Sequence, residues 1–183
     1  MSTQQTPFIQ HTPDTAPEAS RRLMEGTTKK LGYLPAAVGL MATSPHLLEG
    51  FLKVNTMFEQ TTLDPLAREV LIMTVAGRNG CHLCVAMHTA RLKSLNADQS
   101  VITALREGKP LEDKRLDAIR QFTTEVLDTT GAVSPEALAA FTAQGFTHQN
   151  ALEVVMGIGV YTMSTLANRL TDAPIDEQLA AFA

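Results

Sequence analysis

Apolar residues recur along this chain at intervals of three and four, the spacing that gathers side chains on one face of a helix. Within residues 65–76 that face is formed by Leu66, Val70 and Met73, and a longer segment at about 112–129 repeats the pattern. Candidate helix starts are marked by a Ser, Thr or Asp cap or by a proline in the first turn. The pattern therefore predicts a succession of helices.

The predicted helices are joined by short connections, so neighbouring helices should pack antiparallel. Turns are expected at 32–35 and at 77–80, where glycines interrupt the helical pattern. The helices are expected at about residues 17–30, 45–60, 65–76, 81–94, 98–108, 112–129, 135–143 and 147–170, with a short tail helix from residue 174. The prediction is an all-α, single-domain antiparallel helical bundle.

Composition agrees with this fold class. The chain has 183 residues, long enough for one domain with a core, and 44% of them are hydrophobic. Aromatic residues make up only 5% and Trp is absent, whereas residue types that favour helices, such as Ala, Leu and Glu, are abundant. The first sixteen residues hold prolines and little apolar periodicity, which predicts a mobile arm at 1–16 before a helical domain at 17–183.

Charge and cysteine content exclude several classes of function. The formal net charge is −4 and no basic stripe is present, which argues against a nucleic-acid partner. No run of about 18 apolar residues could span a membrane, and the N-terminus lacks the pattern of a signal peptide, so a cytoplasmic location is expected. Two cysteines are too few for a secreted disulfide framework, and a close pair in a reducing compartment indicates catalysis or a metal site.

The cysteine pair carries the candidate chemistry. Cys81 and Cys84 stand one helical turn apart, so both sulfurs lie on one face and can cycle between a dithiol and a disulfide. Cys81 follows Gly80 at the expected start of a helix, where unpaired backbone N–H groups and the helix dipole favour a thiolate. His88 lies four residues after Cys84, where an imidazole can take the thiol proton or protonate a leaving hydroxide. The three residues therefore predict a redox-active dithiol.

Glu69 joins this group through the expected turn. It lies eight residues before Gly77, and His88 lies eight residues after Gly80, so a hairpin that closes between the two glycines brings both side chains to the same level. Without the turn, a continuous helix would separate Glu69 from Cys84 by about 22 Å. With the turn, the carboxylate can orient His88 or relay protons through it.

The order and spacing of Glu69, Cys81, Cys84 and His88 resemble the signature of the alkylhydroperoxidase D (AhpD)-like family, within the carboxymuconolactone decarboxylase superfamily. Residues 64–94 are similar to the core helix-turn-helix motif of that family. The flanking sequences resemble its peroxidase-related branch, so the resemblance covers most of the chain. These flanking sequences are Leu31-Gly32-Tyr33-Leu34-Pro35, Ser44-Pro45 and Ala167-Asn168-Arg169-Leu170.

The resemblance implies an antioxidant oxidoreductase, a thiol-dependent peroxidase that reduces hydroperoxides with no cofactor or metal. Cys84, nearer His88, would be the peroxidatic thiolate that forms a sulfenic acid, and Cys81 would be the resolving and more exposed thiol. Glu69 and His88 would form a proton relay. A lipoyl-bearing or thioredoxin-like dithiol partner would reduce the redox-active disulfide again. Family members assemble as homo-oligomers, so a trimer or hexamer is expected.

One position departs from the best-studied form of the motif, in which a second histidine stands directly before the second cysteine. Here Leu83 occupies that position and the histidine is His82. The shift rotates the imidazole by about 100° around a helix, so we leave His82 out of the relay.

Other interpretations of the cysteine pair stay open. A zinc site would have only three ligands nearby, and two buried, inert thiols would have no chemistry. A disulfide reductase or a redox sensor would use the same oxidation for another purpose. A carboxymuconolactone decarboxylase-like lyase is disfavoured, because those members do not rely on a cysteine pair.

Overall fold

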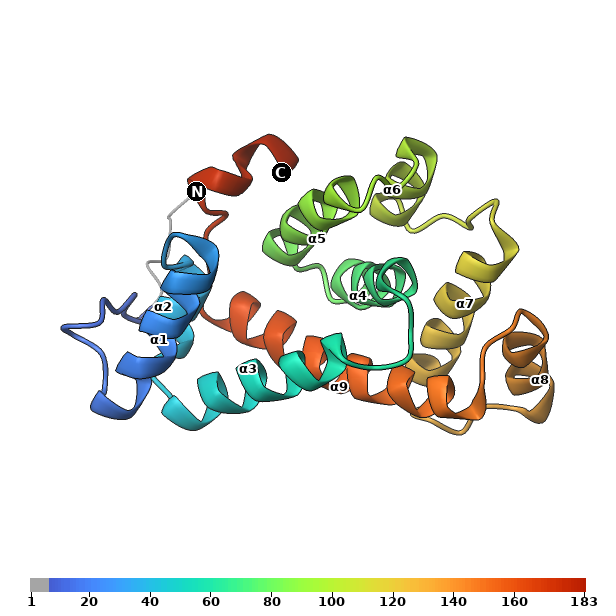
Figure 1. The fold of residues 1–183 in the computed structure, drawn as a ribbon, viewed down its shortest axis with the longest axis horizontal. Helices are drawn as coiled ribbons and strands as arrows, with labels where there is room; N and C mark the ends of the chain where they lie inside the picture. Colours follow the sequence, from blue (N-terminus) through green and yellow to red (C-terminus); the bar gives the residue numbers. More distant parts are fainter. Residues whose placement is uncertain (1–6) are drawn as a thin grey trace.

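Helices form most of the chain that the structure describes, residues 7–183 (Figure 1). The computed structural model has no strand in that range, which confirms the all-α, single-domain prediction. The elements are α1 (Glu18–Leu31), α2 (Ala36–Met41), α3 (Pro45–Glu59), α4 (Pro65–Arg78), α5 (His82–Ser94), α6 (Gln99–Arg106), α7 (Lys114–Asp128), α8 (Pro135–Ala143), α9 (His148–Leu170) and η1, a 3-10 helix (Glu177–Phe182).

Most helix boundaries agree with the sequence prediction, and three elements differ from it. The pattern does not predict α2, because its residues are all apolar and buried and therefore show no polar face. α4 extends beyond Ala76 to Arg78, so the turn is confined to Asn79 and Gly80. The tail helix is a 3-10 helix that begins at Glu177, later than expected.

α4 occupies the centre of the fold. In Figure 1 it lies among α5, α7 and α9, and each of these helices packs on it. Buried apolar side chains cover α4 on several sides, and Val70, Leu71 and Val75 have no exposed surface. Because the helix is covered in this way, its buried carboxylate, Glu69, needs a partner inside the protein.

α9 packs on α3 and α4 at close range. The closest approach is at Gly157, where a Cβ atom would lie 2.7 Å from ring atoms of Phe58 and 2.9 Å from the Leu71 side chain. A glycine at this position therefore lets the helices approach closely. The approach sets the position of the α9 residues that line the site described below.

We expect Gly157→Ala to lower the free energy of unfolding by about 1–3 kcal/mol, because the added methyl group overpacks a rigid core. Urea unfolding should show a lower midpoint with an unchanged slope. Gly159→Ala is the matched control, since a Cβ atom there meets nothing within 4 Å and alanine favours the helix. Equal midpoints for the two variants would contradict the close packing of α9.

The predicted arm at 1–16 lies partly outside the described residues, which begin at residue 7. The rest of the arm forms no helix, and the His11 amide donates a hydrogen bond to the Gly39 carbonyl at 3.1 Å. The division into a mobile arm and a helical domain stays a prediction. Among the described helices, none combines the length and apolar character that crossing a bilayer requires.

Candidate active site

A tight turn between α4 and α5 places the cysteine pair. Gly80 has φ +63°, a left-handed conformation that glycine adopts at low cost. The Cys81 amide donates to the Ala76 carbonyl at 3.0 Å, which closes the end of α4. Cys81 becomes the N-cap of α5, and its Sγ accepts a hydrogen bond from the Cys84 amide at 3.4 Å. The predicted placement of the cysteine pair at a helix N-terminus is therefore confirmed.

The same turn brings Glu69 of α4 beside His88 of α5. Oε2 of Glu69 lies 2.7 Å from Nδ1 of His88, and the two residues are 7% and 8% exposed. The hairpin therefore produces the juxtaposition that the sequence predicts. Since Nδ1 donates to the carboxylate, Nε2 is the nitrogen left for chemistry. The imidazole also packs edge-on against the Tyr161 ring, with centroids 5.2 Å apart.

The two sulfurs lie side by side at the start of α5. Their Sγ atoms are 2.8 Å apart, and both cysteines are free thiols. Cys81 is 2% exposed and Cys84 is 4% exposed, so both thiols are buried and Cys81 is not the exposed thiol that the family resemblance implies. Both cysteines belong to one buried apolar cluster, which also includes Leu179 of the C-terminal segment.

The closeness of the two thiols makes them unequal as acids. A hydrogen bond with the Cys84 thiol, supported by the Cys84 amide and by Asn168, lowers the pKa of Cys81 to about 6 despite burial. The adjacent Cys81 sulfur, together with burial, raises the pKa of Cys84 above its ordinary value. At neutral pH the pair therefore holds one proton, with the negative charge on Cys81 and the proton on Cys84.

Cys84 faces a cavity of about 460 Å³, whereas Cys81 does not line it. Glu69 and His88 line the same cavity, so three of the four predicted site residues meet there and the fourth lies behind Cys84. A volume of this size is typical of a small-molecule site. Much of the remaining wall is apolar and includes Val38, Met41, Phe51, Phe58, Ile72 and Met87.

α9 contributes cavity residues that the sequence analysis does not identify. Tyr161, Ser164 and Asn168 share one helix face and line the cavity. Asn168 donates from Nδ2 to the Cys84 sulfur at 3.3 Å, and the Ser164 hydroxyl also forms a hydrogen bond with Cys84. The signal in the sequence is polar residues at helical spacing within an uncharged stretch, although nothing in that stretch points to the cysteines.

His82 is exposed and does not line the cavity, so the structure gives it no place beside Glu69 and His88. Between residues 7 and 183, no group of three or more His, Cys, Asp or Glu side chains is arranged to hold a metal ion. The arrangement around Cys84 instead combines a thiol pair, an imidazole with a carboxylate partner, and an apolar wall. These are the components of thiol redox chemistry.

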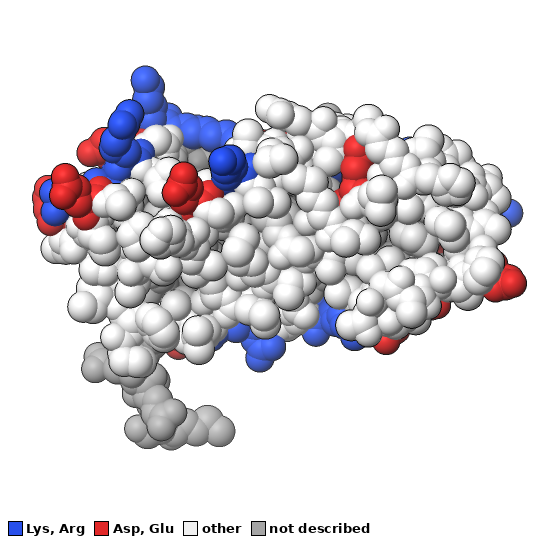
Figure 2. Space-filling view, turned by 90° about the horizontal axis from the view of Figure 1, so that it is seen from below, with Lys and Arg blue, Asp and Glu red and all other residues white. Residues whose placement is uncertain are grey.

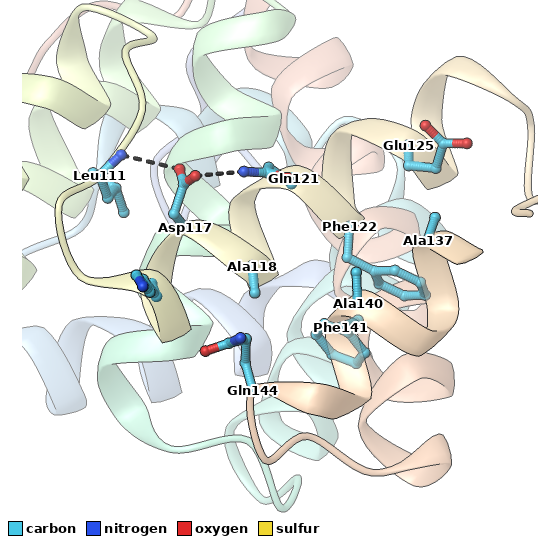
Figure 3. Close-up of a pocket in the computed structure, with 11 residues that line it drawn as sticks. Leu111, Asp117, Ala118, Gln121, Phe122, Glu125, Ala137, Ala140, Phe141 and Gln144 are labelled. Atoms are coloured by element: carbon cyan, nitrogen blue, oxygen red, sulfur yellow. Dashed lines mark hydrogen bonds between the residues drawn. The ribbon is translucent and has the colours of Figure 1, made fainter. Parts of the chain in front are cut away.

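A second cavity, of about 330 Å³, lies between α7 and α8 (Figure 3). Its buried carboxylate, Asp117, accepts hydrogen bonds from the Leu111 amide at 3.0 Å and from Gln121 at 2.5 Å. The stacked rings of Phe122 and Phe141 form part of its wall. It contains no cysteine or histidine, so the thiol chemistry belongs to the first cavity.

Comparison with known proteins gives one family match. Residues 45–108 match the model of the carboxymuconolactone decarboxylase family. This range contains all four predicted site residues, Glu69, Cys81, Cys84 and His88. A comparison with curated proteins gives no significant match.

The fold matches solved structures along nearly its whole length. An AhpD-core, peroxidase-related protein from Ralstonia eutropha JMP134 has a TM-score of 0.83 and 17% identity, over 97% of this chain and 96% of that one. A peroxidase-related protein from Silicibacter sp. TM1040 has a TM-score of 0.79 and 18% identity, over 98% and 97%. A cysteine-to-alanine variant of the debrominase Bmp8, in complex with 2,3,4-tribromopyrrole, has a TM-score of 0.76 and 16% identity, over 100% and 96%. These structures show that the chain has the fold of the AhpD core, and a debrominase shares that fold.

Proposed function

We propose that this chain, which combines a carboxymuconolactone decarboxylase family segment with the AhpD-like fold, is a thiol-dependent peroxidase that reduces organic hydroperoxides. One observation carries the proposal: the Cys84 sulfur faces a largely apolar cavity whose wall holds the Glu69–His88 pair, and the Cys81 sulfur lies 2.8 Å from the Cys84 sulfur. A peroxidatic thiol, a proton donor and a resolving thiol need this arrangement.

In the first step, Sγ of Cys84 attacks the terminal oxygen of the hydroperoxide. A sulfur–oxygen bond forms and the O–O bond breaks, so the sulfur is oxidised to a sulfenic acid and the peroxide is reduced to an alkoxide. The Cys84 proton passes to the Cys81 sulfur, 2.8 Å away. His88 enters this step as the imidazolium, with Nδ1–H donating to Glu69 and a second proton on Nε2. It gives the Nε2 proton to the alkoxide, which leaves as an alcohol, and the ring is left neutral.

In the second step, Cys81 displaces the hydroxyl group of the Cys84 sulfenic acid and forms the disulfide. The Cys81 proton leaves with that hydroxyl as water, so no other acid is needed. A dithiol then reduces the disulfide and is itself oxidised, which returns one proton to Cys84 and one to His88. The net reaction converts a hydroperoxide and a dithiol into an alcohol, water and a new disulfide.

The depth of the sulfurs favours a slender reductant. Cys81 is 2% exposed, Cys84 is 4% exposed, and Cys84 is reached through the cavity. A lipoyl arm can enter such a cavity, whereas a thiol on the surface of a thioredoxin-like protein needs sulfurs at the surface of its target. The lipoyl-bearing partner is therefore the better supported of the two expected reductants.

The family resemblance implies a trimer or hexamer. The surface of α9 is suitable for contact between copies of the chain. No residue between Glu153 and Arg169 is charged. In Figure 2 the middle of the face seen from below is almost free of Lys, Arg, Asp and Glu. An uncharged patch with exposed apolar side chains is typical of a protein–protein interface. The large apolar side chains that α9 leaves exposed are Leu152, Val155, Leu166 and Leu170.

A steady-state assay tests the proposed function. The reduced protein is supplied with dihydrolipoamide and with either hydrogen peroxide or an organic hydroperoxide, and disulfide formation in the donor is followed. We expect faster turnover with the organic hydroperoxide, because the apolar cavity binds its hydrocarbon part. A single oxidation of the thiols without turnover would indicate a redox sensor instead.

A second candidate substrate is a halogenated aromatic ring, because the debrominase Bmp8 shares the fold and its variant is in complex with a brominated pyrrole. The same assay with 2,3,4-tribromopyrrole, followed by bromide release, distinguishes the two activities. Bromide release without reduction of any peroxide would replace the peroxidase proposal with a dehalogenase.

The acidity of Cys81 gives a prediction about pH. Because its pKa is lowered to about 6, the reduced pair should become a monoanion as the pH rises through about 6, and the thiol pair should react faster above that pH. The ultraviolet absorbance of the thiolate, measured against pH, should show this midpoint. Protein unfolded in urea is the control, and its midpoint should return to the ordinary thiol value of about 8.5. Identical midpoints in folded and unfolded protein would contradict the shared proton.

A further inference from the structure

Asn168 of α9 lies against both sulfurs. Its Nδ2 is 3.3 Å from Sγ of Cys84 and 3.9 Å from Sγ of Cys81, and the residue is 5% exposed. An amide NH2 group carries two hydrogens, so it can donate to both sulfurs. A thiolate can only accept, which means that the nitrogen end of the amide, and not its oxygen, must face a charged pair. These hydrogen bonds favour the charged form of either cysteine.

The other end of the Asn168 amide has no hydrogen-bond partner among the described residues. Its Oδ1 atom is buried and unpaired. Buried polar atoms are nearly always paired, and an unpaired one lowers stability. A leucine of similar shape would fill this place without that cost. Packing therefore does not account for an amide at this position, whereas the hydrogen bonds from its nitrogen to the two sulfurs do.

Contacts on either side of Asn168 fix it against the turn that carries the cysteines. Asn79 donates from Nδ2 to Oγ1 of Thr165 at 2.8 Å, and the Arg169 guanidinium donates to the Asn79 carbonyl. Thr165 and Arg169, which flank Asn168 on α9, therefore both connect the helix to Asn79 in the turn. A donor held in place in this way stabilises developing charge with little reorganisation.

We propose that Asn168 is a catalytic residue that stabilises negative charge on sulfur in both halves of the redox cycle, an inference that rests on the proposed peroxidase function. In the resting pair the charge is on Cys81. As Cys84 attacks the hydroperoxide, its proton crosses to Cys81 and the charge moves to the sulfur nearer Nδ2. A hydrogen bond that strengthens as charge arrives lowers the barrier to attack. When a dithiol reduces the disulfide, the same amide receives the thiolate that is released.

Two substitutions of similar shape test this role. Asn168→Leu removes the donor, and Asn168→Asp replaces it with a carboxylate that repels a thiolate. The pH midpoint of thiolate absorbance should rise above the wild-type value in both variants, and it should rise more in Asn168→Asp than in Asn168→Leu. The rate of sulfenic acid formation with an organic hydroperoxide should fall by about 10–100-fold in Asn168→Leu at neutral pH. The rate plateau at high pH should also stay below the wild-type plateau, because the amide acts on the attack itself.

Thr171→Val is the matched control. It removes another buried polar group of the same region, whose hydroxyl bonds only to backbone carbonyls of α9, and it should leave midpoint and rate unchanged. Asn168→Ala repeats the measurement should the leucine variant fail to fold. If the folded variants kept the wild-type midpoint of thiolate titration, or the wild-type rate plateau at high pH, the role of Asn168 would be overturned. The proposed peroxidase function would be unaffected. A wild-type protein that forms no sulfenic acid with any hydroperoxide would overturn the proposed function and this inference together.

Discussion

Replacing Cys84 with serine is expected to abolish hydroperoxide reduction. The Cys84 sulfur is the one that lines the cavity, and a hydroxyl group has neither the acidity nor the nucleophilicity of a thiol. Cys81 cannot take over, because it does not line the cavity through which the hydroperoxide reaches Cys84. We expect turnover with an organic hydroperoxide and dihydrolipoamide to fall by more than about 10³-fold.

Cys81→Ser is the matched variant, since it removes the other thiol of the pair. Cys84 should then react once and stop as a sulfenic acid, because no resolving sulfur lies 2.8 Å away. That reaction should be slower than in the wild type, as the neighbouring thiolate that takes the proton is lost. A sulfenic acid trap followed by mass measurement should find one adduct, at Cys84. Full turnover in both variants, or a sulfenic acid at Cys81 in Cys84→Ser, would contradict the two roles.

The α4–α5 hairpin is the part of the site that could be predicted from the sequence. Helix period, capping residues and a glycine turn are local properties, and together they place Glu69 and His88 at the same level. The two residues are 19 positions apart and meet at 2.7 Å. The all-α fold class follows from the same local signals, since every helix except the wholly buried α2 has its own periodicity and its own start. The core motif of the family resemblance lies in the same segment, and the flanking sequences extend the resemblance over most of the chain.

The rest of the site depends on long-range packing, which periodicity does not encode. Asn168 is 84 positions from Cys84, and their contact depends on how closely α9 approaches α4 at Gly157. The buried cluster that holds both cysteines includes Leu179, which comes from the distant C-terminal segment. A helical pattern shows that a face is apolar, but not which other face covers it. For this reason the sequence predicts the reacting residues and misses their surroundings.

Removing the imidazole of His88 should slow the oxidation of Cys84 by an amount that depends on the leaving group. General acid catalysis of this kind contributes about 10²–10⁴-fold, and we expect a loss of about 10²-fold in His88→Ala with an alkyl hydroperoxide. A peroxy acid should lose much less, because its carboxylate leaves without a proton. Single-turnover oxidation of Cys84, followed with both oxidants, measures the difference. Equal losses with the two oxidants would remove His88 as the proton donor.

Glu69→Gln tests whether the carboxylate acts through His88. A glutamine can still accept from Nδ1 across 2.7 Å, so the geometry persists while the charge is lost, and a smaller loss of about 10-fold is expected. In the double variant Glu69→Gln/His88→Ala, the loss should equal that of His88→Ala alone, because the two residues act as a unit. Additive losses would mean that Glu69 acts on the substrate directly.

The double variant also separates catalysis from stability. His88→Ala alone leaves the Glu69 carboxylate, 7% exposed, without its partner, and an uncompensated buried charge of this kind costs about 3–5 kcal/mol. Glutamine at position 69 carries no charge, so the double variant should unfold at a higher urea concentration than His88→Ala. If its oxidation of Cys84 is nevertheless as slow, the loss of rate comes from the missing proton donor. A return to the wild-type rate together with the recovered stability would instead make the pair structural.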